Sequence, residues 1–169
     1  MGGPGARIWT AAGVGVTVFA VALANHALWS HTGLPLLLTP IGASALLLFS
    51  KPDDPSARFW PVVGGVAISA LAGVVAARLM TPFWACPSAA LLALTTMWAL
   101  RCLHPAGIAV ALTAVVGGPA IRAEGFAFLW RPVIVDWLIV YAMFALFRRL
   151  ASRFNDSPMV MARQREVGA

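Results

Sequence analysis

The chain is an almost unbroken series of apolar runs from Ile8 to Leu150, and few folds can accommodate such a sequence. Hydrophobic residues make up 60% of the 169 residues and charged residues only 11%, whereas soluble domains contain about 45–50% apolar residues. Long runs of this kind are typical of helices that cross a bilayer. The sequence therefore predicts an all-α polytopic membrane protein, with residues 1–169 forming a single membrane domain.

Four of the runs are interpreted as helices that cross the bilayer: 8–29, 59–80, 83–100 and 132–147. The first has a rival interpretation as a signal peptide, because Arg7 precedes it, but it is longer than the apolar core of a usual signal peptide. Near its end, Asn25, His26 and Trp29 are expected to form a polar and aromatic cluster at the membrane interface. The charged stretches 51–58 and 121–131 are expected to be loops.

Two further apolar segments are interrupted or short. The segment 33–50 contains Pro35 and Pro40, and the segment 106–119 has about 14 residues. Proline lacks a backbone donor and blocks the preceding helical turn, so the helix is expected to break or restart near Pro40. Each segment can either cross the bilayer or enter it and return as a half-helix.

A short internal repeat relates these two segments. Residues 39–42 read Thr-Pro-Ile-Gly and residues 104–107 read His-Pro-Ala-Gly, an offset of 65 residues. Downstream, Pro61 and Pro132 each follow an aromatic residue by one or two positions and are 71 residues apart. The sequence thus predicts a two-fold repeat, 8–80 and 83–150, followed by a basic tail, 151–169. Each half has two full spans and one interrupted helix, which gives four full spans plus two half or short spans.

The topology of the repeat depends on whether the short segments cross. Parallel halves follow from four crossings, and inverted halves follow from six. With the tail inside, six crossings place nine Lys and Arg residues inside and three outside, whereas four crossings place seven inside and five outside. Charge bias favours six crossings, and the shortness of 106–119 favours four. In both cases the tail is expected in the cytoplasm, and a bacterial inner membrane or a plasma membrane is the expected location.

The paired helix starts predict an anion site. A helix that begins at Pro40 or Pro105 directs its first amides and its positive dipole end toward the break. His104 can exchange a proton near neutral pH, and Arg101 can supply a fixed positive charge. An acid within a membrane helix, such as Asp136, is a candidate for coupling, although it can also reach the interface. The candidate binding residues are Thr39, Pro40, Gly42, Ser44, Arg101, His104, Pro105 and Gly107, and the candidates for coupling or packing are Asp136, Gly64 and Gly65.

The ordered set of short motifs resembles the HPP family of small integral membrane proteins. The stretches that carry the resemblance are Pro-Ile-Gly-Ala-Ser-Ala at 40–45, Pro-Ser-Ala at 55–57, Val-Gly-Gly at 63–65 and His-Pro-Ala-Gly at 104–107. The family is described as having four transmembrane helices, and its plant plastid and cyanobacterial members are implicated in nitrite transport. The resemblance therefore implies nitrite as a first candidate substrate. Ala106 departs from the second proline of the His-Pro-Pro triplet that names the family.

We expect a transporter or channel for a small monovalent anion. The alternative is a membrane sensor or partner-binding module that does not transport. An enzyme is not expected, because no nucleophile–base pair or cluster of metal ligands is visible, and neither a cofactor nor a metal is predicted. The net charge of +6 is attributed to topology rather than to nucleic acid, because the basic residues are spread through the loops. The expected partners are the lipid bilayer, a small inorganic anion and a second copy of the chain.

Overall fold

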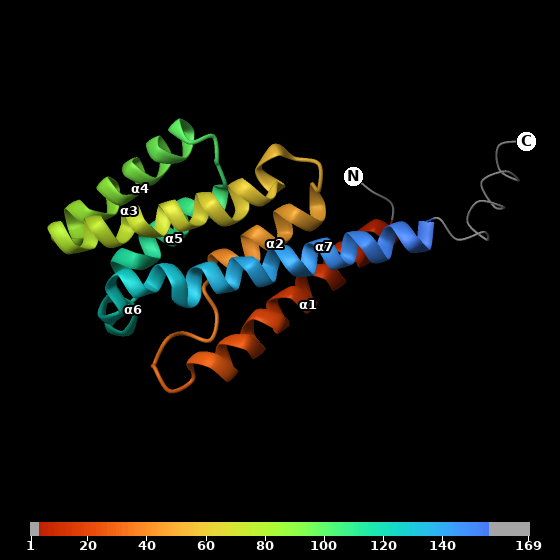
Figure 1. Ribbon diagram of the computed structural model, residues 1–169, viewed down its shortest axis with the longest axis horizontal. Coiled ribbons are helices and arrows are strands. Elements are labelled where there is room, and N and C mark those ends of the chain that lie inside the picture. Colours follow the sequence, from red (N-terminus) through yellow and green to blue (C-terminus); the bar gives the residue numbers. More distant parts are fainter. Residues whose placement is uncertain (1–3, 156–169) are drawn as a thin grey trace, which may run out of the picture.

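The computed structural model describes residues 4–155, and this part of the chain is helical without strands. Two long helices, α1 (Pro4–Trp29) and α7 (Val135–Asn155), frame the fold (Figure 1). Between them lie α2 (Pro40–Ser50), α3 (Val66–Leu79), α4 (Pro82–Ala99), α5 (Pro105–Val116) and α6 (Pro119–Glu124). Short 3-10 turns, η1 (Pro55–Ala57) and η3 (Gly125–Leu129), and π-helical segments, η2 (Trp60–Gly65) and η4 (Trp130–Ile134), complete the chain.

The expected helix starts are confirmed at both short segments. Pro40 and Pro105 each occupy the first helical position, where the missing backbone donor costs nothing and the fixed φ favours a helix. The stretch 121–131, expected to be a loop because of its charges, is instead largely helical, as α6 and η3. Pro119 begins α6, and Gly125, with a φ of +53°, ends it in a conformation that favours glycine.

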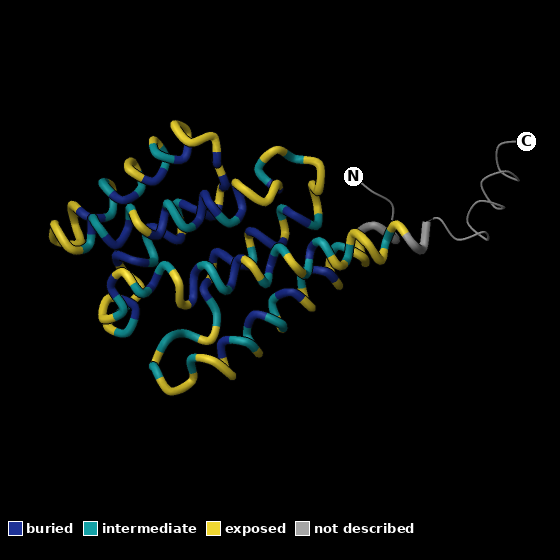
Figure 2. The backbone as a smooth tube through the Cα atoms, viewed as in Figure 1, coloured by how far each residue is buried: buried dark blue, intermediate teal, exposed yellow. Residues whose placement is uncertain are grey.

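The helices pack as two groups that meet along α2 and α5. In the first group, α1 contacts α2 and α7, and α2 also contacts α7; in the second, α3, α4 and α5 contact one another. Contacts of α2 with α5, of η2 with α7 and of η4 with α3 join the groups. Along the long axis of Figure 1, α1, α3 and α5 run from right to left, and α2, α4 and α7 run from left to right. The core, dark blue in Figure 2, follows the facing sides of these helices.

The outer surface is apolar. Large hydrophobic side chains project from α1 and α4, and Phe83 is 77% exposed. Two helices are long and apolar enough to cross a bilayer by length and composition, Arg7–Trp29 and Trp60–Leu79, and α2 and α5 are shorter apolar helices. Exposed side chains of this kind are suited to lipid contact, since lipid tails are as apolar as the side chains themselves.

Three glycines allow the helices to approach one another closely. A Cβ at Gly73 would overlap the backbone of Ala111 in α5, and one at Gly65 would overlap the carbonyl of Cys102. At Gly107, a Cβ would meet the side chains of α3 and α4. Backbones that approach this closely gain packing contacts that larger residues would prevent. The α3–α5 contact is therefore set by glycine.

Candidate functional site

A buried hydrogen bond joins the two short helices. His104 precedes the first residue of α5 and is fully buried, and its Nε2 atom lies 2.9 Å from the hydroxyl of Ser44 in α2. Its Nδ1 atom lies 3.0 Å from the backbone carbonyl of Ser56, in η1. From α7, the indole nitrogen of Trp137 lies 3.0 Å from the same Ser44 hydroxyl. We call these four residues, Ser44, Ser56, His104 and Trp137, the junction.

The partners of His104 determine its tautomer. A carbonyl oxygen only accepts, so Nδ1 carries the hydrogen and donates it to Ser56. In the neutral ring, Nε2 then accepts from the Ser44 hydroxyl, which itself accepts from the Trp137 indole. Each donor therefore has an acceptor, and the junction is complete with a neutral His104. A second proton on Nε2 would force the Ser44 hydroxyl to turn its hydrogen elsewhere.

The loop after α2 is fixed where it meets the junction. The Asp54 carboxylate accepts hydrogen bonds from the Ser56 hydroxyl, at 2.6 Å, and from the Ser56 backbone amide, at 2.8 Å. These two bonds favour the ionised form and lower the pKa of Asp54 below its usual value. Ala57, in the same turn, is buried. The loop therefore folds against the helices and holds the Ser56 carbonyl in place for His104.

A second buried polar pair lies beside the junction. The side-chain amide of Asn25, in α1, donates to the carboxylate of Asp136, in α7, and to the Leu36 carbonyl, at 3.2 Å in both cases. Asn25 is 2% exposed and Asp136 is fully buried. Both side chains are therefore enclosed between helices, where they bond to each other and not to solvent. Asp136 precedes Trp137, so consecutive residues of α7 serve the two polar groups.

The remaining candidates differ in position. Pro40 is buried, whereas Thr39 is exposed and makes no capping bond with its side chain. Gly42 is open, since no atom lies within 4 Å of where its Cβ would be. Pro105 is exposed, and Arg101 is exposed in the turn after α4, with a φ of +52°. The structure thus brings Ser44 and His104 together and places Arg101 in a surface turn.

The helix starts offer fewer free amides than the sequence suggested. The amides of Ile41 and Gly42 donate to the carbonyls of Leu38 and Thr39. In α5, the Gly107 amide donates to the His104 carbonyl. These bonds tighten the first turns and use donors that an anion would otherwise bind. The positive ends of the α2 and α5 dipoles still favour a negative charge at these helix starts.

Three functional candidates come from tertiary contacts that the sequence did not indicate: Asn25, Ser56 and Trp137. The available signal for Trp137 is its place directly after Asp136, an acid in an otherwise apolar run. Gly64 and Gly65 are packing positions: Gly64 lies against the Trp60 ring of its own segment, and Gly65 lies against the Cys102 carbonyl. We therefore assign Gly64 and Gly65 no polar role.

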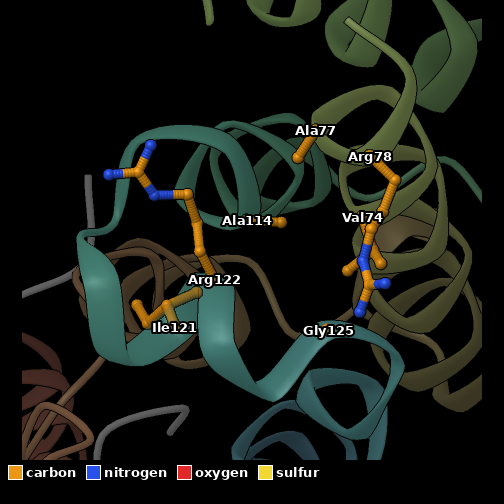
Figure 3. A pocket seen from close by; sticks show the side chains of 7 residues that line it. All are labelled: Val74, Ala77, Arg78, Ala114, Ile121, Arg122 and Gly125. Carbon is orange, nitrogen blue, oxygen red and sulfur yellow. The ribbon is translucent and has the colours of Figure 1, made fainter. Parts of the chain in front are cut away.

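A small cavity lies at the end of the molecule where α3 and α5 finish. It is lined by Val74, Ala77, Arg78, Ala114, Ile121, Arg122 and Gly125. Figure 3 shows the Arg78 side chain extending toward Gly125, while the Arg122 guanidinium points away from Arg78. The Arg78 guanidinium also lies 5.6 Å from the centre of the Phe126 ring. The cavity therefore has one arginine along its wall and a second at its rim.

Comparison with known proteins identifies the sequence class. A family model described as "HPP, transmembrane region" matches residues 2–155. A curated protein of Dictyostelium discoideum, described as a transmembrane protein, is 30% identical over 138 residues, which cover 78% of this chain and 47% of that protein. The chain thus spans about half the length of this relative. No solved structure matches.

Proposed function

The chain belongs to the HPP family of transmembrane proteins, and from this premise we propose that it carries a small monovalent anion across the membrane, as a transporter or channel. The observation that carries the proposal is the buried contact between two short, proline-initiated helices, made by Ser44 of α2 and His104 of α5. Short interrupted helices at corresponding positions of two halves mark the central site of many transporters. The family match is consistent with such a role.

We further propose that the two halves form an inverted repeat with six crossings. The contacts among six of the helices support this, because the same pairs are in contact when α1 is exchanged with α4, α2 with α5, and α3 with α7. The same exchange relates the η2–α7 contact to the η4–α3 contact. In Figure 1 each helix runs opposite to the one with which it is exchanged. Both π-helical segments contain the prolines, Pro61 and Pro132, that defined the repeat.

The proposed anion site lies at the start of α2. The Thr39 side chain is exposed and free of a capping bond, and the backbone at Gly42 is open to approach. The positive end of the helix dipole favours negative charge there, and the Thr39 hydroxyl supplies the hydrogen-bond donor, because the Ile41 and Gly42 amides are already bonded. By contrast, side chains of α3 and α4 fill the space beside Gly107, so an anion cannot approach the backbone there. The start of α2 binds the anion in this proposal, and the start of α5 does not. Arg101, in its surface turn, attracts anions from a distance and does not bind them directly.

The Arg78 cavity is a candidate entrance. It lies at the end of the molecule opposite to the last described turn of α7 (Figure 1). The tail begins within α7, which continues to Asn155, and residues 156–169 lie outside the described part. Exposed guanidinium groups raise the local concentration of anions. The cavity would therefore concentrate anions at this end of the molecule.

The test is uptake by proteoliposomes that contain the purified chain. Nitrite is the first substrate because of the family resemblance, and nitrate, chloride and formate complete the panel. We expect flux of at least one anion above that of empty liposomes. Absence of flux of all four, with protein that unfolds cooperatively, would contradict the proposal. Anion binding without flux would instead support the sensor alternative, as would a loss of output on deleting the tail after Arg149.

A further inference from the structure

The Asn25–Asp136 pair is half of a familiar hydrogen-bonded motif. A primary amide and a carboxyl group can form two parallel hydrogen bonds, one from the amide N–H and one from the acid O–H. The first is present, from Asn25 Nδ2 to Asp136 Oδ2, at 3.2 Å. The other two atoms, Asn25 Oδ1 and Asp136 Oδ1, are buried and have no hydrogen-bond partner. The orientation of the amide is fixed, because both acceptors near it, Asp136 Oδ2 and the Leu36 carbonyl, face Nδ2.

No described cation neutralises Asp136. On α1, His26 neighbours Asn25 in sequence but is exposed. Before α7, Arg131 pairs with Glu124 at 3.0 Å and lies 5.9 Å from the centre of the Trp29 ring. From α5, His104 is bound to Ser44 and Ser56, and α2 presents no titratable group. Within residues 7–152, the Arg131–Glu124 pair is the ion pair that forms.

An ionised Asp136 would therefore be costly. A buried charge without a partner costs several kcal/mol, and this cost is avoided when the group takes up a proton. Two buried acceptor oxygens without partners add a further penalty, since unsatisfied buried polar atoms are rare. A single proton removes both problems at once, because it neutralises Asp136 and supplies the missing donor.

We propose that Asp136 is a proton-binding site, in which a proton on Oδ1 is donated to Asn25 Oδ1 and completes the acid–amide pair between α7 and α1. Binding forms one O–H bond and neutralises the carboxylate. Release returns the proton to water and leaves a carboxylate held only by the Asn25 amide. Two hydrogen bonds therefore join α1 and α7 in the protonated state, and one joins them in the ionised state.

The proton site is placed to act on the junction. Trp137 follows Asp136 and donates to Ser44, which contacts His104. A shift of α7 relative to α1 would therefore move Trp137, and through its bond to Ser44 it would act on the contact between α2 and α5. This second step rests on the proposed function: movement of a proton at Asp136 accompanies movement of the anion, as in uptake of a weak acid in its ionised form together with H⁺.

Infrared spectroscopy tests the proton site without any transport measurement. The C=O stretch of a protonated carboxylic acid is absent from a carboxylate, so it reports the proton directly. We expect this band in the wild-type chain in lipid nanodiscs at neutral pH, its loss in Asp136→Asn, and its persistence in Asp53→Asn, which alters an exposed loop carboxyl. Asn25→Leu removes the acceptor and should shift the band. A wild-type spectrum without the band, or one unchanged in Asp136→Asn, would overturn the proposal.

Flux measurements test the coupling step. Asp136→Asn keeps the shape of the side chain and supplies an N–H in place of the acid O–H, so it mimics the protonated state. We expect it to fold and to lose the acid-stimulated part of anion uptake. If the band is present but no anion is carried by the wild type, the transport proposal fails and the proton site stands. Uptake that depends on Na⁺ and not on pH would overturn the coupling to protons.

Discussion

The junction makes a quantitative prediction about Ser44. In Ser44→Ala, the Trp137 indole loses its acceptor and His104 Nε2 loses its donor, at a position where all three side chains are buried. Leaving a buried polar group unpaired costs about 1–3 kcal/mol in soluble proteins. Hydrogen bonds between membrane helices average about 0.6 kcal/mol, with a maximum of about 1.7. Two lost bonds therefore predict a loss of about 1–3 kcal/mol in the free energy of unfolding.

The matched control is on the same helix. The Ser50 hydroxyl is exposed and donates to the Leu46 carbonyl of its own helix, at 2.6 Å, so Ser50→Ala should change the free energy of unfolding by less than about 0.5 kcal/mol. Trp137→Phe removes the indole N–H and keeps a ring in place. Because Trp137 and Ser44 are bonded, Ser44→Ala should cost less in the Trp137→Phe background, by about 0.5–1 kcal/mol.

The assay is equilibrium unfolding by denaturant in detergent micelles, followed by helical circular dichroism. Each of the four proteins in the double-mutant cycle is measured under the same conditions. Equal stability of Ser44→Ala and Ser50→Ala, together with additive effects of Ser44→Ala and Trp137→Phe, would refute the reasoning. The contact between α2 and α5 would then not depend on the junction.

Two further predictions concern packing and the loop. Gly65→Ala should lower the free energy of unfolding by about 1–3 kcal/mol, because a Cβ would overlap the Cys102 carbonyl. Gly42→Ala should be neutral or slightly stabilising, because the space beside Gly42 is open. Equal melting temperatures of the two variants would contradict this difference. The pKa of Asp54 is lower in the folded state than in the unfolded state, where it is about 3.9. The ionised carboxylate therefore stabilises the fold above the unfolded pKa, and this stabilisation is lost as the pH falls through the folded-state pKa. Melting curves of the wild type and Asp54→Asn should therefore converge in acid, and a constant difference would exclude a role for the Ser56 bonds.

Local rules of sequence predicted part of the fold. Pro40 and Pro105 were placed correctly as helix starts because the preference of proline for the first turn depends on the adjacent backbone alone. The charges in 121–131 predicted a loop, but Pro119 and Gly125 bound a short helix there, so charge was the weaker signal. Residue types alone therefore predicted where the two short helices begin, but they did not predict the short helix between α5 and α7.

The polar contacts could be predicted only in part. Ser44 and His104 were both candidates, and their direct bond depends on how α2 crosses α5, which residue spacing does not determine. Asn25 was expected at the interface because it lies near the end of a long helix; the return of the chain to Pro40 covers it. Trp137 was not among the candidates, because tryptophan in an apolar run is typical of space filling or of an interface.

The central claim is that an anion passes through a site whose geometry the junction maintains. It is tested most directly by the initial rate of nitrite uptake into proteoliposomes that contain equal amounts of folded wild type or His104→Ala. His104→Ala loses both hydrogen bonds that hold the start of α5 to Ser44 and to the Ser56 carbonyl, so we predict a lower rate for the variant. Equal rates for the two proteins, or no uptake by the wild type, would contradict the account.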